Sequence, residues 1–419
     1  MTERDNKNEI VPSAVSGLVK YGSSLVRRGL DDLSNRHSGS FAADVWLERG
    51  EQFQISGHHA EAIPCFEKAI EIDPTCSKAW FLKGISLGGV GRLTDWIESI
   101  NKLLEIYPHD NALRLKGDVL ANLRRFEEAI DCYDSAIQMV PDNVDAWGGK
   151  GYALHGLGRY DEALRCYDES LNRCPENDLS SFTAFMALVG KGDVLANLRR
   201  FEEAIDCYDS AIQMVPDNSL SWMGKGFGLH GLGRYDEALR CYDKCLELGK
   251  FEGGVKAEAS TFYHADAWKL KGVVFSDMGR YPEAAECFDK SIEIDPTYSH
   301  TWYNKGRSLR NMNNFDEAIR CYDKAIELEP EHAKSWTSKG ICLRKLGRLE
   351  EALSCHERAT TCNLPDVLGW YNKASIQEEL GRIQDAIHSY ENYLAGAPPD
   401  ANLIKSVKER LQDLKSRTK

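Results

Sequence analysis

The stretch KGDVLANLRRFEEAIDCYDSAIQMVPDN runs from Lys116 to Asn143, and it returns letter for letter 75 residues later, from Lys191 to Asn218. A second block, LHGLGRYDEALRCYD, runs from Leu154 to Asp168 and returns from Leu229 to Asp243 with the same offset. One copy therefore contains two related units, and the pair has been duplicated. Internal repetition on this scale indicates an array in which each unit packs mainly against its neighbours.

Looser versions of the unit fill most of the chain at a period of about 34 residues. The landmarks of the first unit are Trp46, Gly50, Phe53, Ala62, Phe66, Ala69 and Pro74. Their spacing resembles the tetratricopeptide repeat, whose signature is Trp, Leu, Gly, Tyr, Ala, Phe, Ala and Pro at set intervals. Similar units begin near Ala43, Ser77, Asp110, Val144, Phe185, Ser219, Ala265, Ser299, Ala333 and Val367. The resemblance implies an all-α fold, a right-handed solenoid superhelix of about ten helix-turn-helix repeats over residues 43–400.

The residue pattern within one unit also predicts a helical hairpin. The first helix carries Trp147 with Gly151 one turn later, and the second carries Ala163 with Tyr167 one turn later. Small residues let two antiparallel helices approach closely, while the aromatic rings fill the seam between them. Between the helices, Gly158 is suited to the left-handed conformation that ends a helix. A proline closes most of the second helices and sets the turn into the next unit.

Residues outside the regular units have separate roles. Residues 1–42 precede the array and contain a predicted amphipathic helix at 13–34, followed by a linker. The helix either covers the end of the array, serves in docking or self-association, or lies in the array's own groove. Residues 401–419 have apolar residues on one face and form an expected capping helix with its tail. Inserts at 178–184 and 253–264 either lengthen helices or form loops at one rim of the solenoid.

The second unit departs from the pattern because Trp96 stands where the other units have alanine. A ring at the closest approach of two helices overpacks it by about 1–3 kcal/mol. We therefore expect a locally distorted hairpin, with Gly88 and Gly89 on the partner helix making room for the ring.

Composition limits the classes of function. The net charge of −13 and the pI near 5.4 oppose non-specific binding of nucleic acid. No apolar run is long enough for a membrane span, and the polar N-terminus predicts no signal peptide. Eight of the thirteen cysteines recur at one place in the repeat, which indicates packed, reduced thiols and a cytoplasmic protein.

Catalytic and cofactor-binding motifs are absent from the sequence. The recurrent Gly-Lys-Gly, as at Gly149, lacks the spacing of a phosphate-binding loop, and its lysine is expected to be a solvated helix residue. The histidines and cysteines form no recognisable metal-ligand pattern. We therefore predict a protein that is not an enzyme and has no cofactor.

The resemblance implies which residues face the concave groove, namely positions 2, 5, 9, 12 and 13 of each unit. The middle of the groove then contains Asp118 and Asp193 together with Tyr152, His155, Phe227 and His230. The later units contribute a basic patch that consists of Lys269, His300, Tyr303, Arg307, Arg310, Lys334, Arg344 and Lys345. Such a patch on an acidic protein predicts electrostatic attraction of an acidic peptide.

Some family members hold a partner's C-terminal carboxylate in a clamp of Lys, Asn, Asn, Lys and Arg. Lys269, Asn304 and Lys334 match that pattern, whereas Val273 and Ser338 depart from it. The departures remove one asparagine and the arginine from the implied clamp.

The leading hypothesis is a non-enzymatic scaffold that binds peptide segments or protein partners in the groove. One alternative is a regulatory or assembly subunit that self-associates through the N-terminal helix or a solenoid end. A more remote alternative is a metal-dependent enzyme. Because the inserts have diverged while the duplicated hairpins have not, we expect the duplicated block to be scaffold. Specificity would then lie in the inserts and in the basic units.

Overall fold

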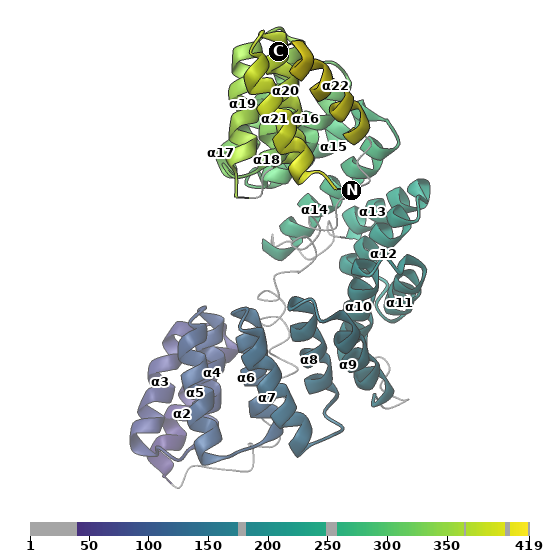
Figure 1. Cartoon of the computed structure of the whole chain (residues 1–419). Helices are drawn as coiled ribbons and strands as arrows, with labels where there is room; N and C mark the ends of the chain where they lie inside the picture. Colours follow the sequence, from purple (N-terminus) through teal and green to yellow (C-terminus); the bar gives the residue numbers. More distant parts are fainter. Residues whose placement is uncertain (1–39, 175–181, 249–257, 364–365, 399–402, 418–419) are drawn as a thin grey trace. The chain divides into compact units, whose positions relative to one another are not determined.

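The structure is a computed structural model that describes residues 40–174, 182–248, 258–363, 366–398 and 403–417. For residues 258–262 it describes the backbone alone. These residues form α-helices joined by short turns (Figure 1), so the all-α prediction is confirmed. The helix predicted at 13–34 lies outside the described residues, as do residues 178–181 and 253–257 of the two inserts.

The helices alternate along the chain between first and second helices of successive repeats. The first helices are α2 (Phe41–Ile55), α4 (Ser77–Gly89), α6 (Asp110–Asn122), α8 (Val144–Gly156), α10 (Phe182–Asn197), α12 (Ser219–Gly231), α14 (Glu258–Asp277), α16 (Ser299–Asn311), α18 (Ala333–Lys345) and α20 (Val367–Glu379). The second helices are α3 (His59–Ile72), α5 (Leu93–Ile106), α7 (Phe126–Met139), α9 (Tyr160–Asn172), α11 (Phe201–Met214), α13 (Tyr235–Leu248), α15 (Tyr281–Ile294), α17 (Phe315–Leu328), α19 (Leu349–Thr361) and α21 (Ile383–Gly396). A final helix, α22 (Ile404–Arg417), follows them.

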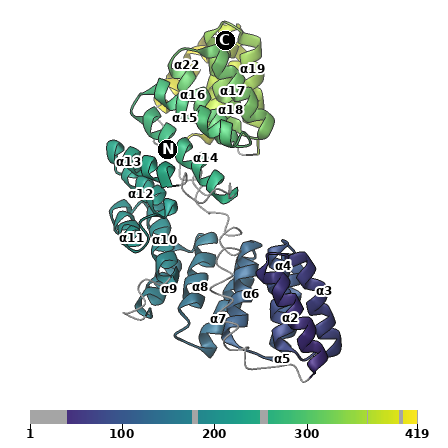
Figure 2. The same ribbon diagram turned by 180° about the vertical axis from the view of Figure 1, so that it is seen from behind.

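The chain divides into two compact units, Met1–Leu232 and Gly233–Lys419. In the first unit, α6 contacts α8, α8 contacts α10 and α10 contacts α12, as the adjacent ribbons in Figures 1 and 2 show. In the second unit, α14 contacts α16, α16 contacts α18 and α18 contacts α20. The first helices α6 to α12 therefore form a continuous layer in the first unit, and α14 to α20 do so in the second.

In most repeats, a glycine of the first helix lies against an aromatic ring of the second helix, whereas the tenth repeat has Ala374 at that position. A Cβ added to Gly117 would lie 2.7 Å from Cε1 of Tyr133, and one added to Gly192 would lie 2.8 Å from Cε1 of Tyr208. Tyr133 and Tyr208 are almost completely buried. The small residue and the ring thus fit together as the sequence pattern predicts, and any larger residue at the glycine would force the helices apart.

The lysine of Gly-Lys-Gly, and the lysine at the same position of other repeats, forms an ion pair with the preceding repeat. The sequence did not reveal these ion pairs. Nζ of Lys150 lies 2.5 Å from Oδ1 of Asp134 in the preceding repeat, so the expectation of a merely solvated lysine is wrong. The same pairing joins Lys83 to Glu67, Lys191 to Asp168, Lys225 to Asp209, Lys271 to Asp243, Lys305 to Asp289, Lys339 to Asp323 and Lys373 to Glu357. The first-helix tryptophan adds a second link, because Nε1 of Trp147 donates a hydrogen bond to the carbonyl oxygen of Pro141 at 2.9 Å.

The inserts coincide with longer first helices. Helix α10 has 16 residues and α14 has 20, against 13 in α6, α8, α12, α16 and α18. The ion pairs Lys191–Asp168 and Lys271–Asp243 are nevertheless formed across both inserts. The repeats on either side of each insert therefore keep the regular register.

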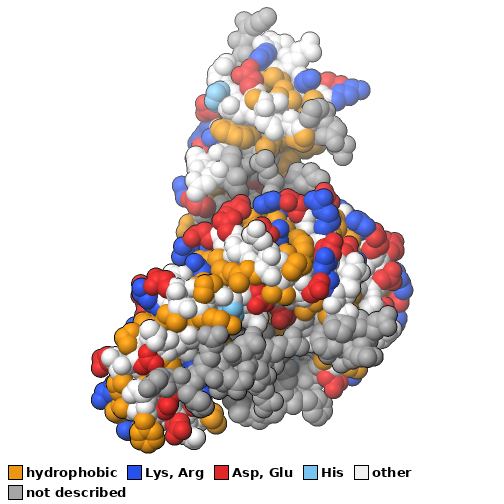
Figure 3. All heavy atoms as spheres, turned by 90° about the horizontal axis from the view of Figure 1, so that it is seen from below, with side chains coloured by type: hydrophobic (Ala, Val, Ile, Leu, Met, Phe, Trp, Pro, Cys, Tyr) orange, Lys and Arg blue, Asp and Glu red, His pale blue; other side chains and the backbone are white. Residues whose placement is uncertain are grey.

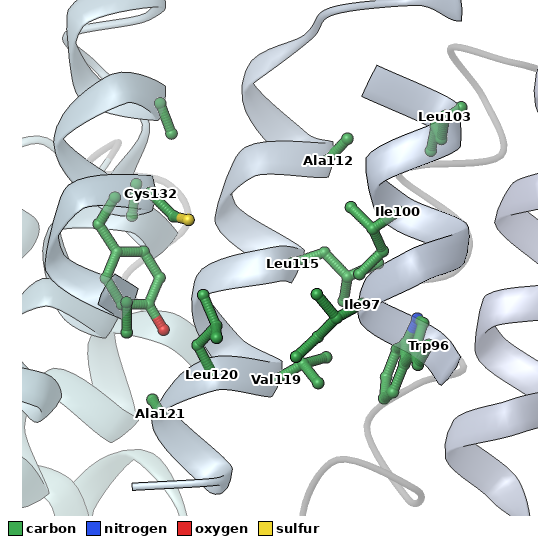
Figure 4. Close-up of a cluster of buried hydrophobic side chains, with 14 of the residues drawn as sticks. Trp96, Ile97, Ile100, Leu103, Ala112, Leu115, Val119, Leu120, Ala121 and Cys132 are labelled. Atoms are coloured by element: carbon green, nitrogen blue, oxygen red, sulfur yellow. The ribbon is translucent and has the colours of Figure 1, made fainter. Parts of the chain in front are cut away.

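The tryptophan of the second repeat is accommodated by two glycines. A Cβ on Gly84 would lie 2.6 Å from Cδ1 of Trp96, and a Cβ on Gly88 would lie 2.5 Å from its Cζ3. Gly89, which was also expected to make room, lies instead against the ring of His59. Beside Trp96, α5 presents Ile97 and Ile100 toward Leu115 and Val119 of α6 (Figure 4). Both α4 and α5 keep the helix lengths of the other repeats, with 13 and 14 residues.

Substitution of Gly88 by alanine should lower the free energy of unfolding by about 1–3 kcal/mol, because the added methyl group overlaps the Trp96 ring. Urea unfolding of the full chain measures this change. The matched control is Gly148→Ala in α8, where the nearest atom, Oγ of Ser170, is 3.5 Å from the added Cβ. That variant should gain about 0.5–1 kcal/mol from helix propensity. Equal losses in the two variants would contradict the close approach of Gly88 and Trp96.

The turns inside the repeats use left-handed backbone, as the sequence predicted for Gly158, which has φ 74°. Three repeats place other residues there, namely Arg124 at φ 58°, Arg199 at φ 60° and Asn313 at φ 61°. An arginine in this conformation carries strain of about 1–2 kcal/mol that glycine avoids.

Arg124→Gly should therefore stabilise the chain by about 0.5–1 kcal/mol, once the larger entropy of an unfolded glycine is subtracted. The reciprocal change, Gly91→Ala, has open space around the added Cβ but retains φ 77°, so it should destabilise the chain by a similar amount. Thermal unfolding distinguishes the two directions. A lower midpoint for Arg124→Gly would contradict the strain.

The thirteen cysteines are all buried and form no disulfide. Burial raises the pKa of the Cys166 thiol to about 11 and that of Cys245 to about 12. They are therefore packed thiols, as the repeat position predicted. At the C-terminus, Val407 and Leu414 of α22 are buried in one apolar cluster with Tyr390 and Tyr393 of α21. Helix α22 thus covers an apolar surface of the last repeat.

Candidate partner-binding face

All of the predicted groove residues lie on first helices. We call this surface the A face and define it by the described groove positions: Asp118, Tyr152, His155, Asp193, Phe227 and His230 in the first unit, and Lys269, His300, Tyr303, Arg307, Arg310, Lys334, Arg344 and Lys345 in the second. Asn304 adjoins Tyr303 on α16. On the surface visible in Figure 3, basic and acidic side chains are interspersed and form no large patch of one sign.

Two cations of the predicted basic patch are neutralised within the chain. Lys269 is only 8% exposed, and its Nζ lies 2.8 Å from Oδ1 of Asp266 one turn earlier. Arg344 forms an ion pair with Glu379 of the next repeat. These pairs reduce the net positive charge that the sequence suggested for the later repeats.

The remaining cations differ in their surroundings. Arg307 lies 3.9 Å from Asp277 and donates a long hydrogen bond of 3.5 Å to Oγ of Ser276. Arg310, one turn further along α16, is half-buried and forms no ion pair with the described residues. Lys334 and Lys345 are exposed. Arg310 is therefore the half-buried cation of this face whose charge the described carboxylates do not compensate.

The charge of Arg310 lowers the pKa of two buried groups on neighbouring helices. Burial raises the pKa of Tyr322 on α17 above its ordinary value, and the Arg310 charge opposes that rise. Burial likewise raises the pKa of the Cys342 thiol on α18, again against the effect of Arg310. The guanidinium therefore acts on groups of two consecutive repeats, Tyr322 in its own and Cys342 in the next.

An aromatic cluster adjoins these cations. The ring centroids of His300 and His332 are 5.1 Å apart. Those of Tyr303 and His332, which meet edge to face, are also 5.1 Å apart. The pKa of His332 is lowered by burial and by the neighbouring His300. His332 escaped the sequence analysis because it precedes α18, outside the groove positions of the repeat, although its spacing of 32 residues from His300 was visible.

The implied carboxylate clamp has weak support at one of its matched positions and at both departing positions. Lys269 is buried against Asp266, and at the departing positions Ser338 is buried and Val273 is apolar. Three of the five implied clamp positions therefore lack a free polar group.

In the first unit, the duplicated block places two identical motifs in different electrostatic settings. Asp118 accepts hydrogen bonds from Nη1 of Arg114 at 2.5 Å and from the Tyr133 hydroxyl at 2.8 Å. Asp193 accepts the equivalent bond from Tyr208 at 2.6 Å, but Val189 stands where the first copy has Arg114. Asp193 is 7% exposed, and burial raises the pKa of its carboxyl to about 7.

The other predicted residues of this unit pack mainly within the repeat layer. Nε2 of His155 lies 2.9 Å from Nδ2 of Asn197, and burial lowers the pKa of His155 to about 4, so the imidazole is neutral at pH 7. The ring of Tyr152 meets that of Phe126 edge-on. Phe227 meets Phe201 in the same way, and His230 is half-buried.

Within the described residues, no group of three or more His, Cys, Asp or Glu side chains is arranged to hold a metal ion. No helix among the described segments is long and apolar enough to cross a membrane.

Comparison with known proteins gives short alignments to repeat proteins. The chain is 28% identical over 123 residues to Superkiller complex protein 3 of Mus musculus, covering 29% of this chain and 8% of that protein. It is 28% identical over 93 residues to TPR repeat-containing protein MJ0940 of Methanocaldococcus jannaschii, covering 22% and 29%. The chain thus matches less than a third of the length of either relative.

Two solved structures align with the chain at low sequence identity. A tetratricopeptide repeat protein from Parabacteroides merdae aligns with 17% identity and a TM-score of 0.46, over 65% of this chain and 98% of that one. The APC/C hetero-tetramer Cut9–Hcn1 aligns with 15% identity and a TM-score of 0.45, over 95% and 94%.

Tetratricopeptide repeat descriptions match residues 43–76, 265–298 and 300–332, residues 114–178 and 189–253, residues 321–354, and residues 369–395. Together these segments cover well over half of the chain. Such repeats mediate protein–protein interactions, which supports the role of an interaction scaffold. The chain belongs to the tetratricopeptide repeat family.

Proposed function

We propose that the protein is a non-enzymatic scaffold, and that the A face of its second unit binds an acidic segment of a partner protein. The observation that carries this proposal is Arg310, a half-buried cation that forms no ion pair with the described residues. A partner's carboxylate would complete its hydrogen bonding, since guanidinium groups bind carboxylates in a bidentate way.

The surroundings of Arg310 suit an extended acidic segment. Tyr303 and His300 offer rings about two and three turns earlier on α16, and aromatic side chains with arginine are the usual anchors of interfaces. Arg307 is held only loosely by Asp277 at 3.9 Å, so it can turn toward a second carboxylate. Lys345 adds an exposed positive charge that would speed association and be screened by salt.

Selection of phage-displayed random dodecapeptides on the full chain at pH 7 tests this function. We expect enriched peptides to contain Asp or Glu and to lose at least tenfold in affinity for Arg310→Glu, because the reversed charge repels them. The matched control is Arg320→Glu on the second helix α17, an exposed arginine 3.7 Å from Glu317. Equal affinities for the two variants would contradict a role for Arg310.

Self-association remains a second candidate because α2 has an exposed apolar surface. Phe41 is 86% exposed and Ile55 is 80% exposed, which is unusual for large apolar side chains at a repeat end. If two copies pair here, light scattering of the full chain should give the mass of a dimer. Phe41→Asp with Ile55→Asp should restore the mass of one chain, and an unchanged mass would argue against pairing through α2.

A further inference from the structure

We propose that Asp193, in the first unit, binds the guanidinium or ammonium group of an arginine or lysine side chain from a partner segment. The incoming cation would take the place that Arg114 occupies in the other copy of the duplicated block. The inference rests on the proposed function, in which partners bind the A face, and adds a second site of opposite charge.

The duplication itself provides the comparison. Residues 116–143 and 191–218 are identical, so Asp118 and Asp193 sit in the same local sequence and each accepts a hydrogen bond from a buried tyrosine. Four residues before each aspartate the copies differ, with Arg114 in one and Val189 in the other. In the first copy, Nη1 of Arg114 lies 2.5 Å from Oδ2 of Asp118. The second copy lacks that cation.

Asp193 receives no other compensating charge. It forms no ion pair with the described residues, and its one hydrogen bond comes from Tyr208 on α11. The neighbouring titratable group on α9 is Tyr167, whose pKa is raised by burial and by the charges of Asp193 and Tyr152. The Tyr167 hydroxyl is therefore neutral at pH 7 and supplies no positive charge. A carboxylate more than nine-tenths buried without a cation is costly, unless a ligand supplies one.

Apolar side chains near Asp193 suit the stem of a long cationic residue. Val189 precedes Asp193 by one helical turn on α10 and is 3% exposed, and the half-buried Tyr152 lies on α8, the first helix that contacts α10. Arginine and lysine stems pack along such apolar surfaces while their charged ends reach a carboxylate. Arg114 does this within the chain, since its side chain is 7% exposed beside Asp118.

Ionisation of Asp193 links binding to pH. With a carboxyl pKa of about 7, Asp193 is mostly neutral at pH 6 and mostly charged at pH 8. A cation binds the charged form, so affinity should rise between these two values. This dependence is opposite to that expected of a histidine in the partner, which would lose its charge over the same range.

The test is a second selection of phage-displayed random dodecapeptides on the full chain, at pH 8. We expect a set of peptides with arginine or lysine at one fixed position. Their affinity should fall at least tenfold for Asp193→Asn, which removes the charge, and for Val189→Arg, which supplies an internal cation. The matched control, Asp206→Asn, removes an exposed carboxylate from α11 and should leave affinity unchanged.

The possible results separate this inference from the proposed function. Peptides without a fixed cationic position, or cationic peptides that bind Asp193→Asn as well as wild type, would overturn the Asp193 site. If acidic peptides still depend on Arg310 in that case, the proposed function stands alone. Should Val189→Arg fail to fold, Asp193→Asn gives the same decision, since its side chain keeps the size of aspartate. Tighter binding at pH 8 than at pH 6 is the further expected result.

Discussion

Arg114→Val should lower the free energy of unfolding by about 3–5 kcal/mol at pH 8, the largest loss that we predict. The substitution removes one partner of a buried ion pair and leaves Asp118 charged, with only the Tyr133 hydroxyl to stabilise it. The valine itself is compatible with the fold, because Val189 occupies the equivalent place in the second copy. The loss therefore reports the electrostatics of Asp118 and not a clash.

The loss should shrink at lower pH. Burial raises the pKa of Asp118, and the Arg114 charge opposes that effect. Without Arg114 the pKa rises further, so the carboxyl binds a proton and becomes neutral as the pH falls. Urea unfolding at pH 5 and pH 8 measures the difference, with Arg125→Val as the control because Arg125 pairs with Glu128 at the exposed start of α7. Similar losses for both variants, or a loss independent of pH, would contradict a buried Arg114–Asp118 pair.

Asp193→Asn should have the opposite effect and stabilise the chain at pH 8. The carboxyl pKa rises from 3.8 to about 7 on folding. The folded state therefore holds a proton that the unfolded chain has released, and stability falls as the pH rises from about 3.8 toward 7. At about 1.36 kcal/mol per pKa unit, the gain from asparagine approaches an upper bound of about 4 kcal/mol above pH 7.

Unfolding of Asp193→Asn and wild type at pH 4, 6 and 8 tests this pH dependence. The two chains should be similar in stability at pH 4, where the wild-type carboxyl is protonated in the folded state, and should diverge as the pH rises. The free energy of unfolding of Asp206→Asn should differ from that of wild type by the same amount at each pH, since Asp206 is exposed. A constant difference between Asp193→Asn and wild type across this range would show that Asp193 keeps an ordinary pKa.

A variant that gains stability and loses binding would connect these two results. Functional sites often retain groups that destabilise the folded protein, and their replacement stabilises it at the cost of activity. The duplicated block fits this description in one copy only. If Asp193 binds a partner as proposed, only the first copy is plain scaffold, because there Arg114 already pairs with the equivalent Asp118.

The fold was predictable from sequence because its determinants recur with the repeat. Gly117 and Tyr133 are one pair of a series, and the period reveals which small residue meets which ring. The second repeat was harder, since Trp96 shifts the ring by one helical turn. The sequence analysis proposed Gly88 and Gly89 as partners, whereas the geometry of α4 shows that Gly84 and Gly88 face the ring.

The candidate site was less predictable because charge compensation depends on contacts between repeats. Lys269 looked available, although Asp266 three residues earlier was a visible signal for a pair on one helix face. The Arg344–Glu379 pair spans 35 residues, and it needs the stacking of α18 on α20. The difference between Arg114 and Val189 was visible in the sequence. Its electrostatic consequence became evident only from the ion pair between Arg114 and Asp118 in the structure.

Photo-crosslinking tests most directly whether the A face binds partner segments. Benzoylphenylalanine would replace either Asn311, the exposed residue that follows Arg310 of the A face at the end of α16, or Arg320 on the second helix α17. With the acidic dodecapeptide selected on the full chain, we predict crosslinks from position 311 that excess unlabelled peptide abolishes, and none from position 320. Crosslinks from position 320 alone, or equally from both, would contradict binding through the A face.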